Sequence, residues 1–219
     1  MIKLYFDIET IPSAQEDRDG HVAILKKRKS NGDKNDDEMH ESTSFEGTFG
    51  RICCIGIIKE DGVGKILQKE VFKGTEKEIL TKFWDTARDV NRFIGHNIWT
   101  FDLPFIYKRS IINGIRPRYD ISFARYRNIP IYDTMLEWEL WNFQKSQKLD
   151  TLAKVLGLPT SKDEMDGSMV WPYYKEGRID EICTYCMKDV VLTRQVYKKM
   201  TFEQEEYLPQ GKKEEGDEF

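Results

Sequence analysis

Near its N-terminus the chain reads Ile2-Lys3-Leu4-Tyr5-Phe6-Asp7-Ile8-Glu9-Thr10, and this stretch decides the fold. Its even positions from 2 to 8 are apolar, a two-residue period that predicts a β-strand with one face in a core. Asp7 and Glu9 then share the other face and present two neighbouring carboxylates. Such a pair repels unless a cation lies between its members, and oxygen ligands favour hard ions such as Mg²⁺ or Mn²⁺. The alternative is a strand end with two solvated acids.

Length and composition predict a single, fairly large domain. The chain has 219 residues, of which 39% are hydrophobic and 33% charged. No apolar run approaches the roughly 18 residues of a membrane-spanning helix, and no secretory signal precedes the first strand, so we expect a cytoplasmic protein with no membrane partner. The net charge of −4 comes from the end of the chain, because residues 203–219 hold seven acids and two lysines. We expect one domain over residues 1–207 and an acidic, disordered tail over 208–219.

The cysteines form two close pairs in the sequence, Cys53-Cys54 and Cys183-x-x-Cys186. The second pair has zinc-like spacing, but its surroundings are helical in pattern and no further pair of that kind follows. We interpret all four as small buried thiols in a reducing compartment, with metal or redox use as the alternative.

Along the chain, strand patterns come first and helical patterns follow. Residues 13–44 are polar and predict a flexible insertion, a loop or a loosely docked helix followed by a flexible segment. Strands are predicted at 2–10, 52–58, 66–72, 92–96 and 129–132. Helices are predicted from Thr75 with a capping box, near Asp102, from Met135, from Asp150 or Thr151, and over about 178–206. This order favours an α+β or mixed α/β sandwich around one sheet.

Two downstream segments carry further candidate site residues. Pro104 fits only the first turn of a helix, which places Asp102 at a helix N-terminus where the dipole favours its charged form. The alternative is that Asp102 only caps that helix. Tyr185 and Asp189 are four residues apart, so they lie one above the other on the last helix. A tyrosine hydroxyl positions water well but is a poor general base, since its ordinary pKa is near 10.

In combination these motifs resemble a known superfamily. The chain holds Asp-x-Glu on a first strand, Asn-x-x-x-Phe-Asp at a helix start and Tyr-x-x-x-Asp on a late helix. This order is similar to the DnaQ-like DEDD 3′–5′ exonucleases in their tyrosine branch (DEDDy), and more narrowly to the predicted exonuclease domain related to family B DNA polymerase proofreading domains. Local matches also occur at 50–52, 133–135, 149–152, 166–170 and 176–178.

The resemblance implies an α/β, RNase H-like fold, with a five-stranded mixed sheet and helices on both faces. It also implies that Asp7, Glu9, Asp102 and Asp189 hold two divalent cations, Mg²⁺ or Mn²⁺. Asp7 would bridge both ions, Glu9 and Asp189 would complete the nucleophile side, and Asp102 would support the leaving-group side. Tyr185 would complete the catalytic set by orienting the attacking water.

Substrate contacts are predicted around the middle motif and just beyond it. By the resemblance, His96, Asn97 and Phe101 would contact the terminal nucleotide, although His96 and Asn97 could equally hold the strand end. Residues 105–128 interleave six cations with aromatic rings against one acid, and Arg125 and Arg127 are the predicted phosphate contacts. Cations for phosphates and rings for unstacked bases are typical of a single-strand groove. The alternative is a solvated basic surface with its rings packed inward.

The sequence therefore predicts a metal-dependent 3′–5′ exonuclease that releases 5′-mononucleotides from DNA, preferring single-stranded or frayed ends. An exoribonuclease on the same scaffold is an alternative, because discrimination at the 2′-hydroxyl depends on pocket shape. A non-catalytic module for nucleic-acid or protein interaction is another. These residues contain no polymerase domain, so a proofreading role would require a separate polymerase or a replication or repair protein as partner.

Overall fold

A five-stranded mixed sheet forms the centre of the molecule. The computed structural model describes residues 1–28, 34–119, 121–160 and 165–203. The strands are β1 (Lys3–Ile11), β2 (Arg51–Glu60), β3 (Ile66–Lys73), β4 (Arg92–Gly95) and β5 (Ile131–Asp133). Their order is β3-β2-β1-β4-β5, with β2 antiparallel to both of its neighbours and β4 parallel to β1 and β5.

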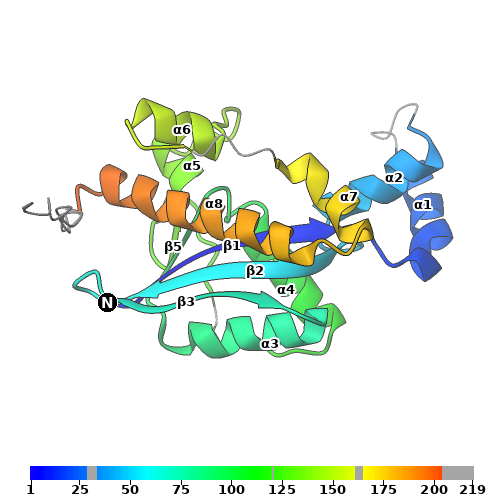
Figure 1. Cartoon of the computed structure of the whole chain (residues 1–219), viewed down its shortest axis with the longest axis horizontal. Coiled ribbons are helices and arrows are strands. Elements are labelled where there is room, and N and C mark those ends of the chain that lie inside the picture. Colours follow the sequence, from blue (N-terminus) through cyan, green and yellow to red (C-terminus); the bar gives the residue numbers. More distant parts are fainter. Residues whose placement is uncertain (29–33, 120, 161–164, 204–219) are drawn as a thin grey trace, which may run out of the picture.

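Helices cover both faces of this sheet (Figure 1). On one face lie α3 (Glu76–Thr86) and α4 (Asp102–Ile112), and α8 (Ile179–Met200) runs across the other. Shorter helices are α1 (Arg18–Lys26), α2 (Asp36–Ser42), α5 (Thr134–Trp138), α6 (Leu149–Val155) and α7 (Val170–Lys175). The prediction of an α/β fold with a five-stranded mixed sheet and helices on both faces is confirmed.

The alternation along β1 assigns its side chains to the two faces. Phe6 packs against Phe83 of α3 with ring centroids 5.3 Å apart, whereas Tyr5 packs against Tyr197 of α8 at 5.6 Å. Because side chains alternate along a strand, Asp7 points with Tyr5 toward the α8 face. A register shift after Glu9 marks an irregularity in the β1–β2 pairing at this point, and such irregularities re-aim side chains near sites.

Several helix boundaries differ from the predicted ones, and the backbone gives the reason. The predicted long helix over 178–206 ends at Met200, because Phe202 adopts a left-handed φ of 55°. Similarly, the helix predicted from Met135 stops at Trp138, just before left-handed residues at positions 140 and 141. The next helix begins at Leu149, after the N-cap Lys148 rather than at Asp150 or Thr151. By contrast, the capping box of Thr75 and Glu78 is confirmed.

The segment predicted as a flexible insertion contains ordered helices. Helices α1 and α2 share a small core built from Val22, Leu25, Met39 and Phe49, and they lie beyond the end of β1, near α7 (Figure 1). Residues 29–33 of this segment and the predicted tail at 208–219 lie outside the described residues. None of the described helices is both long and apolar enough to cross a bilayer.

Gly56 lets α8 approach the sheet beside Asp7. It pairs with Asp7 in the β1–β2 register, and a Cβ at this position would lie 3.0 Å from both the Cys186 Sγ and the Val190 Cγ2 of α8. Contacts this short force the neighbouring atoms apart, and both neighbours belong to a buried helix face.

We predict that Gly56→Ala destabilises the protein by about 1–3 kcal/mol, the usual cost of overpacking a core. The free energy of unfolding from urea denaturation measures this. Gly20→Ala is the matched control, since nothing lies within 4 Å of a Cβ at that helical position and alanine is the better helix former. Equal stability of the Gly56→Ala variant and the wild type would contradict this account of the β2–α8 contact.

Candidate active site

Two carboxylates of the site come from β1. Asp7 is half-buried and Glu9 is buried, and both lie on the sheet face that α8 covers. The strand fixes their spacing, because residues i and i+2 project from the same face.

The third carboxylate, Asp102, reaches the same place from the other side of the sheet. It is the first residue of α4, as predicted, and it is buried. Its Oδ1 accepts a hydrogen bond from the backbone N–H of Ile8 at 3.2 Å. The start of α4 is therefore joined to β1 between the two strand acids.

Helix α8 supplies the remaining groups. Tyr185 and Asp189 lie one turn apart, and a hydrogen bond joins their side chains. Between them in the sequence, the buried Cys186 donates to the backbone oxygen of Asp7 at 3.4 Å. The sequence analysis favoured a core role for this thiol, with metal or redox use as the alternative, and could not place it beside Asp7, because that position depends on how α8 packs.

The effects of these carboxylates on one another's pKa indicate that they lie close together. Burial raises the pKa of Asp7 well above its ordinary range, and the nearby Asp102 and Asp189 raise it further. Burial likewise raises the pKa of Glu9, with Asp7 the largest of the neighbouring charges. For Asp102, burial and then Asp133 raise the pKa to about 8. Asp7 and Glu9 offer ligand atoms within 4.8 Å of each other, and Asp102 and Asp189 lie close enough to act on the charge of both.

The hydroxyl of Tyr185 joins this set. Burial raises its pKa far above the usual value near 10, and Asp189, Glu9 and Asp7 raise it further. Tyr185 therefore stays protonated at neutral pH, so it can donate and accept hydrogen bonds but cannot act as a base.

The donor set fits a hard divalent cation. Among the described residues, no lysine or arginine offsets the charge of Asp7, Glu9 or Asp102. Buried carboxylates without a protein cation are costly in their charged form. A divalent ion with oxygen ligands would supply the missing positive charge.

Asp133 organises the loop that leads to Asp102, a role that sequence reasoning missed. Its carboxylate accepts hydrogen bonds from the backbone N–H groups of Asn97 and Trp99, both at 2.9 Å, and it also caps α5. The sequence carried two signals for it, the local family match at 133–135 and its place at the end of a strand directly before a helix, where an acid serves as an N-cap.

His96, Asn97 and Phe101, the predicted nucleotide contacts, differ from one another in their surroundings. Both ring nitrogens of His96 have protein partners, the Thr134 hydroxyl at 2.9 Å and the backbone oxygen of Gln147 at 2.7 Å. These bonds favour the alternative that His96 holds the strand end. Asn97 has a left-handed φ of 64° and is half-buried, and Phe101 packs against the Phe105 ring at 5.6 Å.

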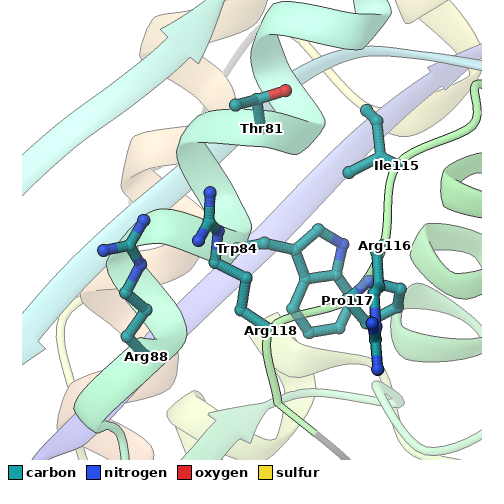
Figure 2. A pocket seen from close by; sticks show the side chains of 7 residues that line it. All are labelled: Thr81, Trp84, Arg88, Ile115, Arg116, Pro117 and Arg118. Atoms are coloured by element: carbon teal, nitrogen blue, oxygen red, sulfur yellow. The ribbon is translucent and has the colours of Figure 1, made fainter.

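The basic segment does not form the single groove predicted from the sequence. Arg109 is buried and makes two hydrogen bonds to Glu76, at 2.9 and 2.7 Å. Arg116 and Arg118 line a pocket of about 760 Å³ against α3, where Figure 2 shows them around Trp84 with Arg88. The segment is divided because Arg109 pairs with Glu76 of α3 and Arg116 and Arg118 lie against α3, whereas Arg125 packs on Trp99.

Arg125 and Arg127 remain near the loop that carries the site. The Arg125 guanidinium lies 5.4 Å from the Phe143 ring centroid and 5.9 Å from that of Trp99. Trp99 itself packs in a ring cluster, which we call the aromatic cluster, with Phe123, Trp141 and Phe143. Beside it, Tyr126 is 71% exposed and lines a cavity of about 530 Å³ with Arg127. The aromatic cluster thus combines accessible rings with two cations.

Comparison with known families agrees with this geometry. Residues 44–217 match the family described as "Predicted 3'-5' exonuclease related to the exonuclease domain of PolB". The chain therefore belongs to this family of 3′–5′ exonucleases and is an enzyme of the hydrolase class. Asp102, Tyr185 and Asp189 lie within the matched residues, whereas Asp7 and Glu9 precede them. Enzymes of this kind use divalent metals.

A solved structure shows the same fold. The family B DNA polymerase from the hyperthermophilic archaeon Pyrobaculum calidifontis is similar with a TM-score of 0.61 and 17% identity, over 92% of this chain and 24% of the polymerase. The fold is that of a polymerase exonuclease domain, which is RNase H-like. The chain spans about a quarter of the polymerase's length. Among curated proteins no match was found.

The raised carboxyl pKa values predict how the metal-free protein responds to pH. An unfolded aspartate titrates near 3.9, whereas the folded pKa of Asp102 is about 8. The folded state therefore binds this proton more tightly, so stability is full below the unfolded pKa and is lost as pH rises toward 8. In chelator, we predict that the free energy of unfolding falls between about pH 5 and pH 8, and falls less in Asp102→Asn.

Urea denaturation at the two pH values measures this difference. A tenfold difference in proton affinity between the folded and unfolded states corresponds to about 1.4 kcal/mol. A difference of this size between the wild type and the variant, in the loss of unfolding free energy between the two pH values, is measurable. An equal fall in wild type and Asp102→Asn would show that this carboxyl is not held protonated in the fold.

Proposed function

We propose that this chain is a metal-dependent 3′–5′ exonuclease that removes 5′-mononucleotides from DNA, with single-stranded or frayed ends preferred. The observation that carries the proposal is the convergence of Asp7, Glu9, Asp102 and Asp189 beside the Tyr185 hydroxyl. These groups come from β1, α4 and α8, so the site exists only in the folded chain.

In this proposal the four acids hold two divalent ions, Mg²⁺ or Mn²⁺. Asp102 and Asp189 both raise the pKa of Asp7, so Asp7 is close to each of them. This proximity supports the assignment of Asp7 as the ligand shared by both ions. Glu9 and Asp189 would then complete the ligands of one ion, and Asp102 those of the other. When bound, such ions lower the pKa of water and stabilise the charge on both oxygens of an in-line phosphoryl displacement.

Tyr185 orients the attacking water and does not remove its proton. Its hydroxyl remains protonated because it is buried and near three acids. Its bond to Asp189 fixes the ring, and the remaining hydrogen-bonding capacity can hold a water beside the scissile phosphate. Glu9, on β1, assists Tyr185 in placing the water.

The aromatic cluster would receive the single strand that leads to the site. Trp99 is three residues before Asp102, and the adjoining Tyr126 is exposed. Bases would stack on the exposed rings while Arg125 and Arg127 neutralise phosphates. Proofreading by this enzyme would act on the 3′ ends left by a separate polymerase.

In the decisive assay, the protein is incubated with 5′-labelled DNA or RNA oligonucleotides and Mg²⁺ or Mn²⁺, and shortening from the 3′ end is measured. The assay is then repeated with a chelator. We expect metal-dependent shortening from the 3′ end and none in chelator or in Asp7→Ala. Tyr185→Phe should slow turnover by about 100-fold or more, the contribution typical of a positioned catalytic group, with DNA affinity nearly unchanged.

The same assay separates the alternatives. Faster shortening of RNA than of DNA would identify an exoribonuclease. Binding of oligonucleotides without degradation under any metal would favour a non-catalytic module. Full activity of Tyr185→Phe would remove this residue from the mechanism.

The salt dependence of binding tests the strand path. Each phosphate contact contributes about 0.7 to the slope of log affinity against log salt for single strands. We predict that Arg125→Gln with Arg127→Gln flattens the slope by about 1.4, measured by fluorescence anisotropy with Asp7→Ala protein. The matched control is Arg116→Gln with Arg118→Gln in the α3 pocket (Figure 2). If the control pair flattens the slope as much, the strand does not follow the aromatic cluster specifically.

A further inference from the structure

A thiol lies among the site carboxylates. The Sγ of Cys186 is 3.7 Å from the Asp7 Oδ2, in addition to its bond to the Asp7 backbone oxygen. One ligand atom each from Asp7, Glu9 and Cys186 can be chosen so that all three lie within 4.8 Å of one another. This grouping mixes two hard oxygen ligands with one soft sulfur ligand.

The separation of the Cys186 and Asp7 ligand atoms is close to that of two ligands in a tetrahedral zinc site. With Zn–S near 2.3 Å and Zn–O near 2.1 Å, two ligand atoms of a tetrahedron lie about 3.6 Å apart. The observed separation of Cys186 Sγ and Asp7 Oδ2 is 3.7 Å, so the pair needs almost no movement to share an ion. A magnesium site would not use the sulfur, because Mg²⁺ takes oxygen ligands in an octahedral arrangement.

Further thiols lie beside this sulfur in the core between the sheet and α8. The Cys54 thiol is hydrogen-bonded with the thiols of both Cys183 and Cys186. Asp7 is the more accessible member of the set, being half-buried where Cys186 is fully buried. An ion would therefore enter past the Asp7 carboxylate and reach the sulfur last.

We propose that Asp7, Glu9 and Cys186 form a binding site for soft or borderline divalent ions of the zinc and cadmium class, and that such ions inhibit the enzyme. On binding, the S–H bond of Cys186 breaks, its proton passes to solvent, and a sulfur–metal bond forms. Thiolate ligands select zinc-class ions over Mg²⁺. The bound ion withdraws Asp7 and Glu9 from the hard-metal arrangement. The inhibition, though not the binding, rests on the proposed nuclease function.

The binding test is spectroscopic and needs no substrate. Cd²⁺ is titrated into the metal-free full chain, and the thiolate-to-cadmium charge-transfer absorbance in the ultraviolet is recorded. We expect a saturable band in the wild type that is lost in Cys186→Ser and in Cys186→Ala. Cys183→Ser, one turn earlier on α8, is the matched control and should keep the band. A wild type without a band, a band that survives in both Cys186 variants, or one lost equally in Cys183→Ser would overturn the proposal.

The inhibition test compares Zn²⁺ titrations of Mg²⁺-supported degradation, each relative to the same variant's own uninhibited rate. Outer-shell changes alone cost 10–100-fold in metal affinity, so loss of a ligand should raise the half-inhibitory zinc concentration by at least about tenfold in Cys186→Ser. An unchanged value would overturn the inhibitory role. Absence of nuclease activity would remove the proposed function but leave the cadmium band to decide the site.

Discussion

Mutual repulsion of buried carboxylates is the constraint on which the rest of this structure depends. Burial raises the pKa of Asp7 and Glu9 most, and Asp102 and Asp189 raise both further, with Asp7 acting on Glu9 as well. Like charges in a low-dielectric site disfavour the folded state. Because the described residues provide no cation for the first three, the scaffold has to hold these acids in place without ion pairs.

Apolar packing and backbone hydrogen bonds meet that requirement. On one face, Phe6 and Phe83 belong to the core that fixes β1 against α3. On the other, α8 lies close to β2 because Gly56 has no side chain. The start of α4 is held twice, by the Ile8 N–H on Asp102 and by the carboxylate of Asp133 on the preceding loop. The positions of the acids are thus set mainly by packing and by main-chain hydrogen bonds.

The features predicted correctly from the sequence are those that local rules determine. The strand β1, the capping box at Thr75 and the place of Asp102 at a helix start each depend on a few neighbouring residues. That both faces of β1 are buried, and not one, was missed, because α8 covers the second face. The helix ends after Trp138 and Met200 depend on left-handed residues that are not glycine, for which the sequence carries no strong signal. The separation of the arginines depends on tertiary packing, because their spacing in the sequence does not show that Arg116 and Arg118 lie against α3 while Arg125 packs on Trp99.

The close approach of α8 links core packing to metal chemistry. Tyr185 and Asp189 lie on the shoulder of the helix, whereas Cys186 points at the sheet, directly over Gly56. A residue at this position must be small enough for the contact, and it also lies beside the Asp7 carboxylate. Alanine or serine would satisfy the packing without offering a soft ligand, but cysteine adds one. The ion preference of the site therefore depends on a residue whose first requirement is to fit between a helix and a strand.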